Sequence, residues 1–317
     1  MDNPPSITAE SPSIKEEVRI IEVSPRDGLQ NITSQIPTST KLSLIQRLAQ
    51  SGLKNIELTS IVSPRAVPQL SDCCDVLDSS IVRNLLHPGT DGANNMRLPV
   101  LVPNIKGLEI AMQHNVKEIA VFTSASEGFS HANINCSVRE GIERAKTVAE
   151  RALRNGMQVR AYISCIFTDP HTQTLTPLSS VLECTQALLD AGVYEISLGD
   201  TTGTGTPSLI RSLLSYLAAN SIPINKLAAH IHDSHGRGIE NVWTAYTCGV
   251  RVFDSSVSGL GGCPFAGPEA QGNVATEDVV ELFEGKGVGT GVDLGMVKEV
   301  GAWIGGFVRG ICNSTRP

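Results

Sequence analysis

The chain alternates between two patterns of hydrophobic positions, one typical of strands and one typical of helices. Residues Val18–Ser24 form a short run rich in β-branched side chains that stops at Pro25, which predicts a buried strand. In Thr38–Ser51 the apolar side chains fall on one helical face, and Gly52 follows directly, which predicts a helix and its end. Between them, residues 26–30 are expected to form a loop.

The joint between a helix and the next strand recurs along the chain. A helix ends, one Gly or Asn turns the backbone, and an apolar run begins, at residues 51–57, 114–120, 155–161, 191–197 and 248–254. With three further apolar runs, this gives eight expected strands, near residues 18, 54, 97, 117, 158, 193, 226 and 251. Eight βα units in a chain of 317 residues favour a (β/α)₈ TIM barrel, with an open doubly wound sheet as the alternative.

Composition narrows the class of protein. The net charge of −7 and the absence of a basic run argue against nucleic acid or an anionic membrane as a partner, and no apolar run is long enough for a transmembrane helix. Eight cysteines without a CxxC motif suggest reduced thiols. The polar segment 1–17 lacks the features of a targeting sequence, so we expect it to be disordered and the protein to be cytoplasmic. Residues 18–317 then form one barrel domain.

The strand expected at Lys226–Asp233 ends in two histidines, His230 and His232. Side chains two apart on a strand project to the same side, with Cα atoms roughly 6–7 Å apart, so both rings can reach one cation. Asp27, after the first strand, would add a carboxylate. This mixture of ligands is compatible with Mg²⁺, Mn²⁺ or Zn²⁺. The alternative is a pair of ordinary histidines at the end of a strand.

Other reactive side chains also follow strands, where the active sites of TIM barrels lie. Arg26 precedes Asp27 and could stabilise an oxyanion such as a thioester enolate, although a surface position is the simpler interpretation. Glu57 lies late in the second strand and Asp200 follows the sixth. Both are candidates for acid–base chemistry, and both could equally be partners in salt bridges.

A glycine-rich loop spans residues 259–273 and carries Cys263. It could be a mobile lid that brings this thiol over the site, or only a flexible connection. Asn273, at its end, could complete the shell of the cation through its amide oxygen.

Several motifs, in order over roughly residues 18–295, resemble those of the 3-hydroxy-3-methylglutaryl-CoA lyase family. These are Arg26-Asp-Gly-Leu-Gln30, Glu57-Leu-Thr-Ser60, Asn133-Ile-Asn-Cys136, Glu195-Ile-Ser-Leu-Gly-Asp-Thr201, His230-Ile-His-Asp233, Gly261-Gly-Cys-Pro264 and Gly272-Asn-Val-Ala-Thr-Glu-Asp278. The resemblance implies a divalent-cation-dependent retro-Claisen cleavage of an acyl-CoA to acetyl-CoA and acetoacetate, with Mg²⁺ or Mn²⁺ as the expected cation. It leaves a homodimer as one expected assembly.

The resemblance also implies roles for individual residues. The cation ligands are Asp27, His230, His232 and Asn273, of which His230 also belongs to the catalytic group. Arg26 stabilises the enolate and Cys263 takes part in proton transfer. Glu57 and Asp200 match acidic residues of the active site.

Three alternatives stay open. Condensing enzymes of the isopropylmalate and homocitrate synthase type share a similar start and HxH strand, but they usually have His-x-His-Asn and lack the Gly-Gly-Cys-Pro segment. A catalytically silent barrel would have lost a ligand residue, and none is missing. Departures from the lyase pattern at Phe167–Gln173, at His235, within Leu77–Met96 and in the length of the 263–273 loop surround the acyl pocket. They keep a related 3-hydroxyacyl-CoA, in a specialised pathway, as a candidate substrate.

Overall fold

The structure is a computed structural model that describes residues 16–86, 96–261 and 272–314. Most of the segment expected to be disordered, residues 1–15, lies outside this range, as does Cys263. Glu16 and Glu17 are described, and Gly289 donates its N–H to the Glu16 carbonyl at 2.9 Å.

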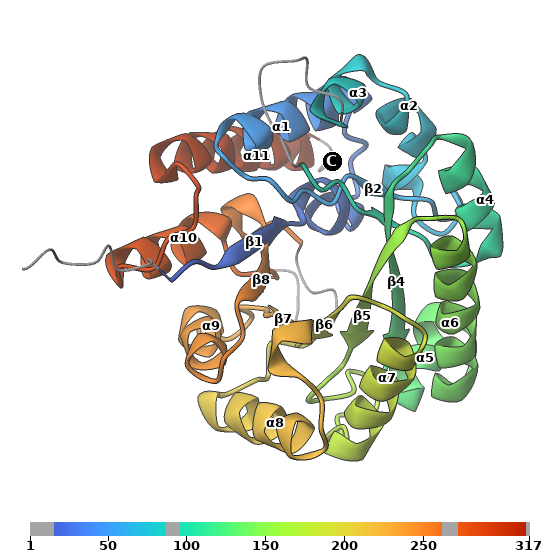
Figure 1. Cartoon of the computed structure of the whole chain (residues 1–317). Helices are drawn as coiled ribbons and strands as arrows, with labels where there is room; N and C mark the ends of the chain where they lie inside the picture. Colours follow the sequence, from blue (N-terminus) through green and yellow to red (C-terminus); the bar gives the residue numbers. More distant parts are fainter. Residues whose placement is uncertain (1–15, 87–95, 262–271, 315–317) are drawn as a thin grey trace, which may run out of the picture.

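Eight parallel strands form one sheet that curls around a central axis (Figure 1). They are β1 Arg19–Glu22, β2 Thr59–Ser60, β3 Val100–Leu101, β4 Glu118–Ser124, β5 Gln158–Ser164, β6 Glu195–Gly199, β7 Leu227–His230 and β8 Val252–Ser255. The sheet closes through the backbone of Glu22. Its carbonyl accepts from the N–H of Glu57, and its N–H donates to the carbonyl of Asn55, both at 2.9 Å. The predicted (β/α)₈ barrel is therefore confirmed, although β2 and β3 are shorter than the apolar runs suggested.

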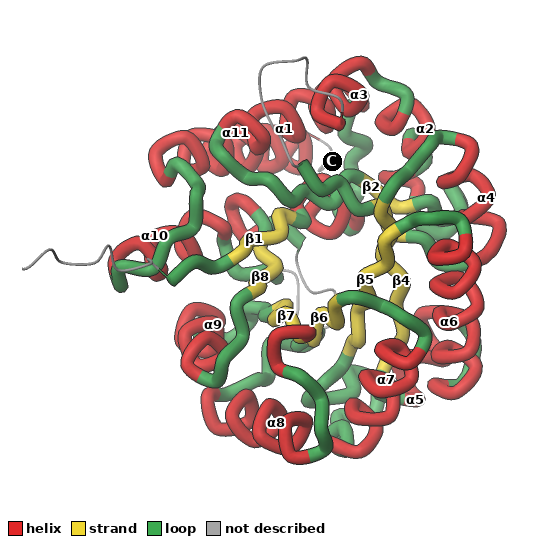
Figure 2. Tube along the Cα trace, viewed as in Figure 1, coloured by secondary structure: helices red, strands yellow, loops and turns green. Residues whose placement is uncertain are grey.

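Helices surround the strands on the outside (Figure 2). The expected helix at Thr38–Ser51 is α1, Thr38–Gln50. The longer of the others are α4 Ile105–Gln113, α5 Glu127–Ile134, α6 Val138–Arg154, α7 Leu178–Asp190, α8 Pro207–Ala219, α9 Gly238–Thr247, α10 Thr276–Gly285 and α11 Leu294–Ser314, and two short helices, α2 Cys73–Leu77 and α3 Ser80–Leu86, lie between β2 and β3. In the described part of the chain, no helix is long and apolar enough to cross a membrane.

The alternation of side chains along each strand divides the interior into two parts. Outward residues such as Val159, Ala161 and Ile163 on β5 join the large apolar core between the sheet and the helices. Inward residues face the bore of the barrel, where a small separate cluster contains Ile21, Val23, Ala228 and Val252. This cluster fills only part of the bore.

Charged side chains also lie in the bore. Arg160 and Glu195 lie on β5 and β6, and Asp254 lies on β8, all 2% exposed or less. A guanidinium N–H of Arg160 donates to Asp254 Oδ1 at 2.9 Å, and its Nε lies 3.2 Å from Glu195 Oε1. The interior of a barrel is more often filled by branched apolar residues. Because buried charges are costly unless they are paired, these three residues depend on one another.

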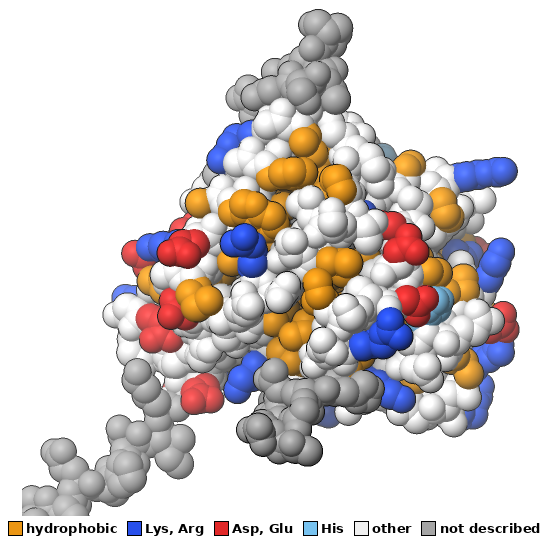
Figure 3. Space-filling view, turned by 90° about the horizontal axis from the view of Figure 1, so that it is seen from above, with side chains coloured by type: hydrophobic (Ala, Val, Ile, Leu, Met, Phe, Trp, Pro, Cys, Tyr) orange, Lys and Arg blue, Asp and Glu red, His pale blue; other side chains and the backbone are white. Residues whose placement is uncertain are grey.

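The face over α1 and α11 carries charges of both signs around a scattered group of hydrophobic side chains (Figure 3). No continuous basic band crosses the described part of this face.

Glu22, where the barrel closes, is fully buried and receives three hydrogen bonds. They come from the N–H groups of Ser24 at 2.9 Å and Val257 at 3.1 Å, and from the hydroxyl of Thr276 at 2.6 Å. Burial raises the pKa of the Glu22 carboxyl, and the hydrogen bonds, those from Ser24 foremost, lower it in part. This one side chain therefore ties β1 to the segment after β8 and to the start of α10.

We predict that Glu22→Ala lowers the free energy of unfolding by roughly 3 kcal/mol or more, because three buried donors lose their acceptor. Glu22→Gln keeps an acceptor for the two N–H groups, and the Thr276 hydroxyl can turn to accept from the new amide. It should cost clearly less. Urea unfolding followed by circular dichroism measures both variants, and equal losses would contradict the assigned role of the acceptor oxygens.

Candidate active site

Arg26 and Asp27 lie on a tight turn directly after β1. The N–H groups of Arg26, Asp27 and Gly28 all point at the Val23 carbonyl, at 3.2, 2.8 and 3.2 Å. Residues Ser24–Gly28 therefore form a single π-helical turn where an irregular loop was expected. Such turns are frequent at functional sites. Here the turn directs two consecutive charged side chains into the barrel mouth.

The carboxylate of Asp27 divides its two oxygens between two groups of neighbours. Oδ1 accepts from Arg26 and, at 2.9 Å, from Gln30. Oδ2 accepts from Asn273 at 2.7 Å and lies 4.0 Å from His230 Nε2. Burial raises the pKa of Asp27, but Arg26 and the histidines outweigh that effect, so the net pKa lies below its usual value. The group is thus held as a carboxylate.

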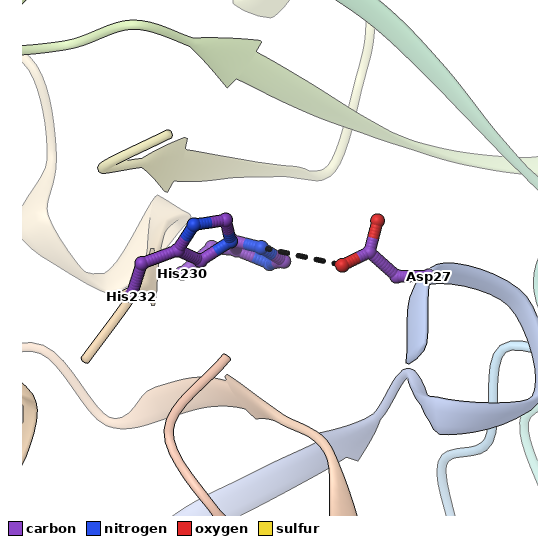
Figure 4. A group of neighbouring side chains, drawn as sticks. All are labelled: Asp27, His230 and His232. Carbon is purple, nitrogen blue, oxygen red and sulfur yellow. Dashed lines mark ion pairs between the residues drawn. The ribbon is translucent and has the colours of Figure 1, made fainter. Parts of the chain in front are cut away.

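His230 and His232 face Asp27 from the end of β7 (Figure 4). One ligand atom from each of these three residues lies within 4.8 Å of the others, and the ring centroids of the two imidazoles are 5.3 Å apart. Burial, and then the neighbouring His230, lower the pKa of His232 to about 4. A neutral imidazole is the form that binds a metal ion, so His232 is ready to act as a ligand near neutral pH.

The other ring nitrogen of each histidine already has a partner. His230 Nδ1 lies 3.2 Å from Asp254 Oδ2, and His232 Nδ1 lies 3.0 Å from the Thr201 carbonyl oxygen. Both partners are acceptors, which favours the tautomer with the proton on Nδ1 and a free lone pair on Nε2. This is the arrangement that metal-binding histidines usually have.

Asn273 approaches the same point from the end of the glycine-rich loop. Its amide nitrogen donates to Asp27 Oδ2 and to the Leu260 carbonyl, whereas Oδ1 is buried without a hydrogen-bond partner among the described residues. Gly261 makes this approach possible, since a Cβ there would lie 2.4 Å from the Asn273 amide nitrogen. Half a turn of the amide would bring the unpaired oxygen towards Asp27. The donor set therefore fits a divalent cation with two oxygen and two nitrogen ligands.

Arg26 lies against this group and is almost fully buried. Its Nε donates to Glu57 Oε2 at 2.7 Å, and its guanidinium carbon lies 5.2 Å from the centre of the Tyr162 ring. The Tyr162 hydroxyl donates to the same Glu57 oxygen at 3.0 Å. Burial alone would lower the pKa of Arg26, but the carboxylates of Glu57 and Asp27 raise it by more. The guanidinium is therefore permanently charged. Glu57 thus fixes the orientation of Arg26.

A cavity of about 570 Å³ opens above these residues. Arg26, Asp27, His230 and His232 form part of its lining together with Tyr162, and apolar side chains of α5 and of the segment after β2 also line it. With a cation bound to this group, the fixed guanidinium and the apolar side chains of the lining would suit a ligand with an anionic head and a less polar body.

One of the predicted site residues, Asp200, lies away from the cavity, and the structure does not place another, Cys263. Asp200 does not line the cavity; its Oδ2 accepts from the Gly205 N–H at 2.9 Å, and burial raises its pKa to about 6. It holds the loop whose Thr201 carbonyl contacts His232. Cys263 lies outside the described residues. The prediction of a catalytic role for either residue therefore stays a prediction.

Sequence reasoning missed four residues that contact the site: Gln30, Tyr162, Thr201 and Asp254. The sequence could have indicated Asp254, because a carboxylate in the middle of an apolar strand has to face a buried partner. Tyr162 had a weaker signal, since it lies two residues after Arg160 on β5 and therefore faces the same way. The contact of Thr201 uses its backbone, which no residue type reveals.

These features define a (β/α)₈ barrel enzyme class with a cation-binding group and a buried arginine at the carboxyl ends of its strands. The chain belongs to the HMGL-like family, whose sequence profile matches residues 17–304. The resemblance noted in the sequence is therefore confirmed.

Individual relatives cover most of the chain. It is 47% identical to "Hydroxymethylglutaryl-CoA lyase, mitochondrial" of Arabidopsis thaliana over 93% of this chain, which spans 60% of that protein. It is 45% identical to "3-hydroxy-3-methylglutaryl-CoA lyase, cytoplasmic" of Mus musculus over 96% of this chain and 84% of the relative. The crystal structure of the HMG-CoA lyase from Brucella melitensis is 43% identical and superposes with a TM-score of 0.86, covering 93% of this chain and 99% of that one.

The raised pKa of Asp200 gives a prediction about stability and pH. The folded protein holds this proton up to about pH 6, whereas the unfolded chain releases it near pH 3.8. The contribution of Asp200 to stability is thus present at low pH and is lost as the pH rises through 6. The free energy of unfolding of Asp200→Asn minus that of the wild type should therefore increase by about 2 kcal/mol when the pH is raised from about 4.5 to 7. Urea unfolding in chelator measures it, and a difference independent of pH would contradict the assignment.

Proposed function

We propose that this protein cleaves 3-hydroxy-3-methylglutaryl-CoA to acetyl-CoA and acetoacetate. The observation that carries the proposal is the shared wall of the cavity, on which Arg26 lies beside the ligand group of Asp27, His230 and His232. Cleavage needs one group to acidify a tertiary hydroxyl and another to receive the charge that leaves with the thioester. The two halves of this wall supply them.

The bond changes in this reaction balance without a further reactant. The C3 hydroxyl loses its proton to a base, the C2–C3 bond breaks, and C3–O becomes the ketone of acetoacetate. The electron pair of the broken bond moves onto the thioester as an enolate, which takes up a proton at C2 to become acetyl-CoA. The chain therefore has to orient the hydroxyl, stabilise the enolate oxygen and return one proton.

Asp27, His230, His232 and Asn273 would hold the divalent cation, with Mg²⁺ or Mn²⁺ as the proposed ion. When bound, such a cation acts as a Lewis acid that lowers the pKa of a hydroxyl and fixes its position. The chain contributes the geometry: the partners of the two Nδ1 atoms hold both lone pairs towards Asp27, and Arg26 binds the oxygen of Asp27 that faces away from His230.

Arg26 is the proposed site of enolate stabilisation. Glu57 and the Tyr162 ring hold its guanidinium in one place, so no reorientation is needed when negative charge develops. Glu57 then acts as a positioning residue. We assign the same kind of role to Asp200, through the loop that carries Thr201, and we keep Cys263 as the proposed thiol for proton transfer.

A related 3-hydroxyacyl-CoA is the second candidate substrate, because the loop after β5 departs from the lyase pattern. In this loop Asp169 accepts from the N–H of Phe129 on α5 at 3.2 Å, and His171 joins the lining of the cavity. The loop that departs from the pattern therefore contributes to the wall of the cavity, which also includes the expected Arg26, Asp27, His230 and His232. A homodimer remains a proposal. So does a cytoplasmic location, since the named relatives include both mitochondrial and cytoplasmic proteins.

The first test is acetyl-CoA release from 3-hydroxy-3-methylglutaryl-CoA with Mg²⁺, Mn²⁺ or chelator. We expect activity with either cation and none in excess chelator. His232→Ala should lose Mn²⁺ binding and activity together. Absence of acetyl-CoA from the wild type under all conditions would reject the proposed function.

Arg26→Lys separates the two halves of the site. Lysine keeps the charge but loses the planar fork that contacts Glu57 and Asp27. We expect a fall in kcat of roughly 10²- to 10³-fold, larger than any fall in Mn²⁺ affinity because lysine keeps the positive charge beside Asp27. Isothermal titration and steady-state kinetics measure the two quantities, and an unchanged kcat would remove Arg26 from the mechanism.

The choice of substrate is tested by comparing kcat/KM for several 3-hydroxyacyl-CoAs. If the departures after β5 alter the acyl pocket, the kcat/KM of another thioester will exceed that of 3-hydroxy-3-methylglutaryl-CoA. A clear preference for 3-hydroxy-3-methylglutaryl-CoA would end the second candidate.

A further inference from the structure

Asp254 lies beneath the cation-binding group and receives three donors. Oδ1 accepts from Arg160 at 2.9 Å, and Oδ2 accepts from the Ser197 hydroxyl at 2.6 Å and faces His230 Nδ1 at 3.2 Å. Asp254 is 1% exposed, and Arg160 and Ser197 are fully buried. No water can easily replace any of these partners.

We propose that Asp254 is a positioning residue that sets the tautomer of His230, and that Arg160 forces it to do so. This inference rests on the proposed function only in assigning His230 to a cation. The arginine cannot lose its protons, so one oxygen of residue 254 must always accept from it. The second oxygen is then left for His230, which can only donate to a carboxylate from Nδ1. Nε2 is thereby left unprotonated and free to bind a cation.

The replacement Asp254→Asn should reverse this arrangement. An asparagine has one acceptor oxygen, and the buried Arg160 would claim it. The amide N–H groups would then face Ser197 and His230. The Ser197 hydroxyl can turn to accept, but His230 can accept only by giving up its Nδ1 proton. Its proton would move to Nε2, the atom that should bind the cation, just as the wrong tautomer follows when the aspartate of a catalytic triad is replaced by asparagine.

His232 provides an internal contrast. Its Nδ1 contacts the Thr201 carbonyl, which belongs to the backbone and stays an acceptor whatever the side chain. Only the tautomer of His230 therefore depends on a side chain. A change at Asp254 should alter one imidazole and leave the other as it is.

Glu195→Gln is the matched control. Glu195 is also buried and also pairs with Arg160, its Oε1 lying 3.2 Å from the Arg160 Nε. Both variants remove one negative charge from the same arginine, so both should share the general loss of stability. Only Asp254→Asn touches His230.

The tautomers can be read from two-bond ¹H–¹⁵N spectra of metal-free protein labelled with ¹⁵N-histidine, at about pH 8 where imidazoles are neutral. We expect the Nδ1–H form for His230 in the wild type and in Glu195→Gln, and the Nε2–H form in Asp254→Asn. His230→Gln assigns the signal. The wild-type spectrum tests the proposal even if Asp254→Asn does not fold, because an Nε2–H form there would overturn it.

Titration with Mn²⁺ gives the second measurement. Loss of such a partner typically weakens metal binding by roughly 10- to 100-fold, and we expect this in Asp254→Asn but not in Glu195→Gln. Equal weakening in both would show a structural effect only and overturn the proposal, as would wild-type affinity in Asp254→Asn. None of these readouts uses acetyl-CoA release, so a wild type that fails to cleave the thioester would reject the proposed function and leave this inference standing.

Discussion

The pairing of Arg160 inside the barrel is the constraint on which the site depends. A guanidinium that water cannot reach needs partners, and three strands supply them: Asp254 and the Tyr162 hydroxyl accept hydrogen bonds at 2.9 Å, and Glu195 forms an ion pair at 3.2 Å. Two of these partners lead onward to the reactive groups. Tyr162 donates to Glu57, which holds Arg26, and Asp254 faces His230. One buried charge thus sets the position of both halves of the cavity wall.

The same arrangement occurs twice in the site: a carboxylate has one oxygen next to an arginine and the other next to a histidine. Asp27 lies in this way between Arg26 and His230 at the cavity surface, and Asp254 lies between Arg160 and His230 below it. In both cases the arginine fixes the carboxylate as an anion. Asp254 then orients the imidazole through Nδ1, whereas Asp27 faces Nε2 at 4.0 Å, where both can serve as ligands. Buried pairs of this kind add little net stability, because desolvation offsets their attraction. Their contribution is orientation.

The sequence predicted the barrel and the main ligand group for one physical reason. Parallel strands bring their carboxyl ends to one rim, so a residue that follows a strand has few places to go. This placed Asp27, His230 and His232 together although some two hundred positions separate them. It gave no information on where a side chain turns after the strand ends. Asp200 turns towards Gly205, and the π-helical turn at Ser24–Gly28 depends on three N–H groups sharing one carbonyl, which no residue type signals.

The two imidazoles are held in position by different parts of the fold. His232 lies just beyond β7 and bridges to Asn273, so its position depends on loops, and a backbone carbonyl orients it. His230 is the last residue of β7 and pairs in register with Asp254 on β8, so its partner is a side chain on rigid sheet. A ligand held between two strands can be placed more accurately than one held by loops. It follows that the sheet places His230 more accurately than the isolated bridge places His232 and Asn273.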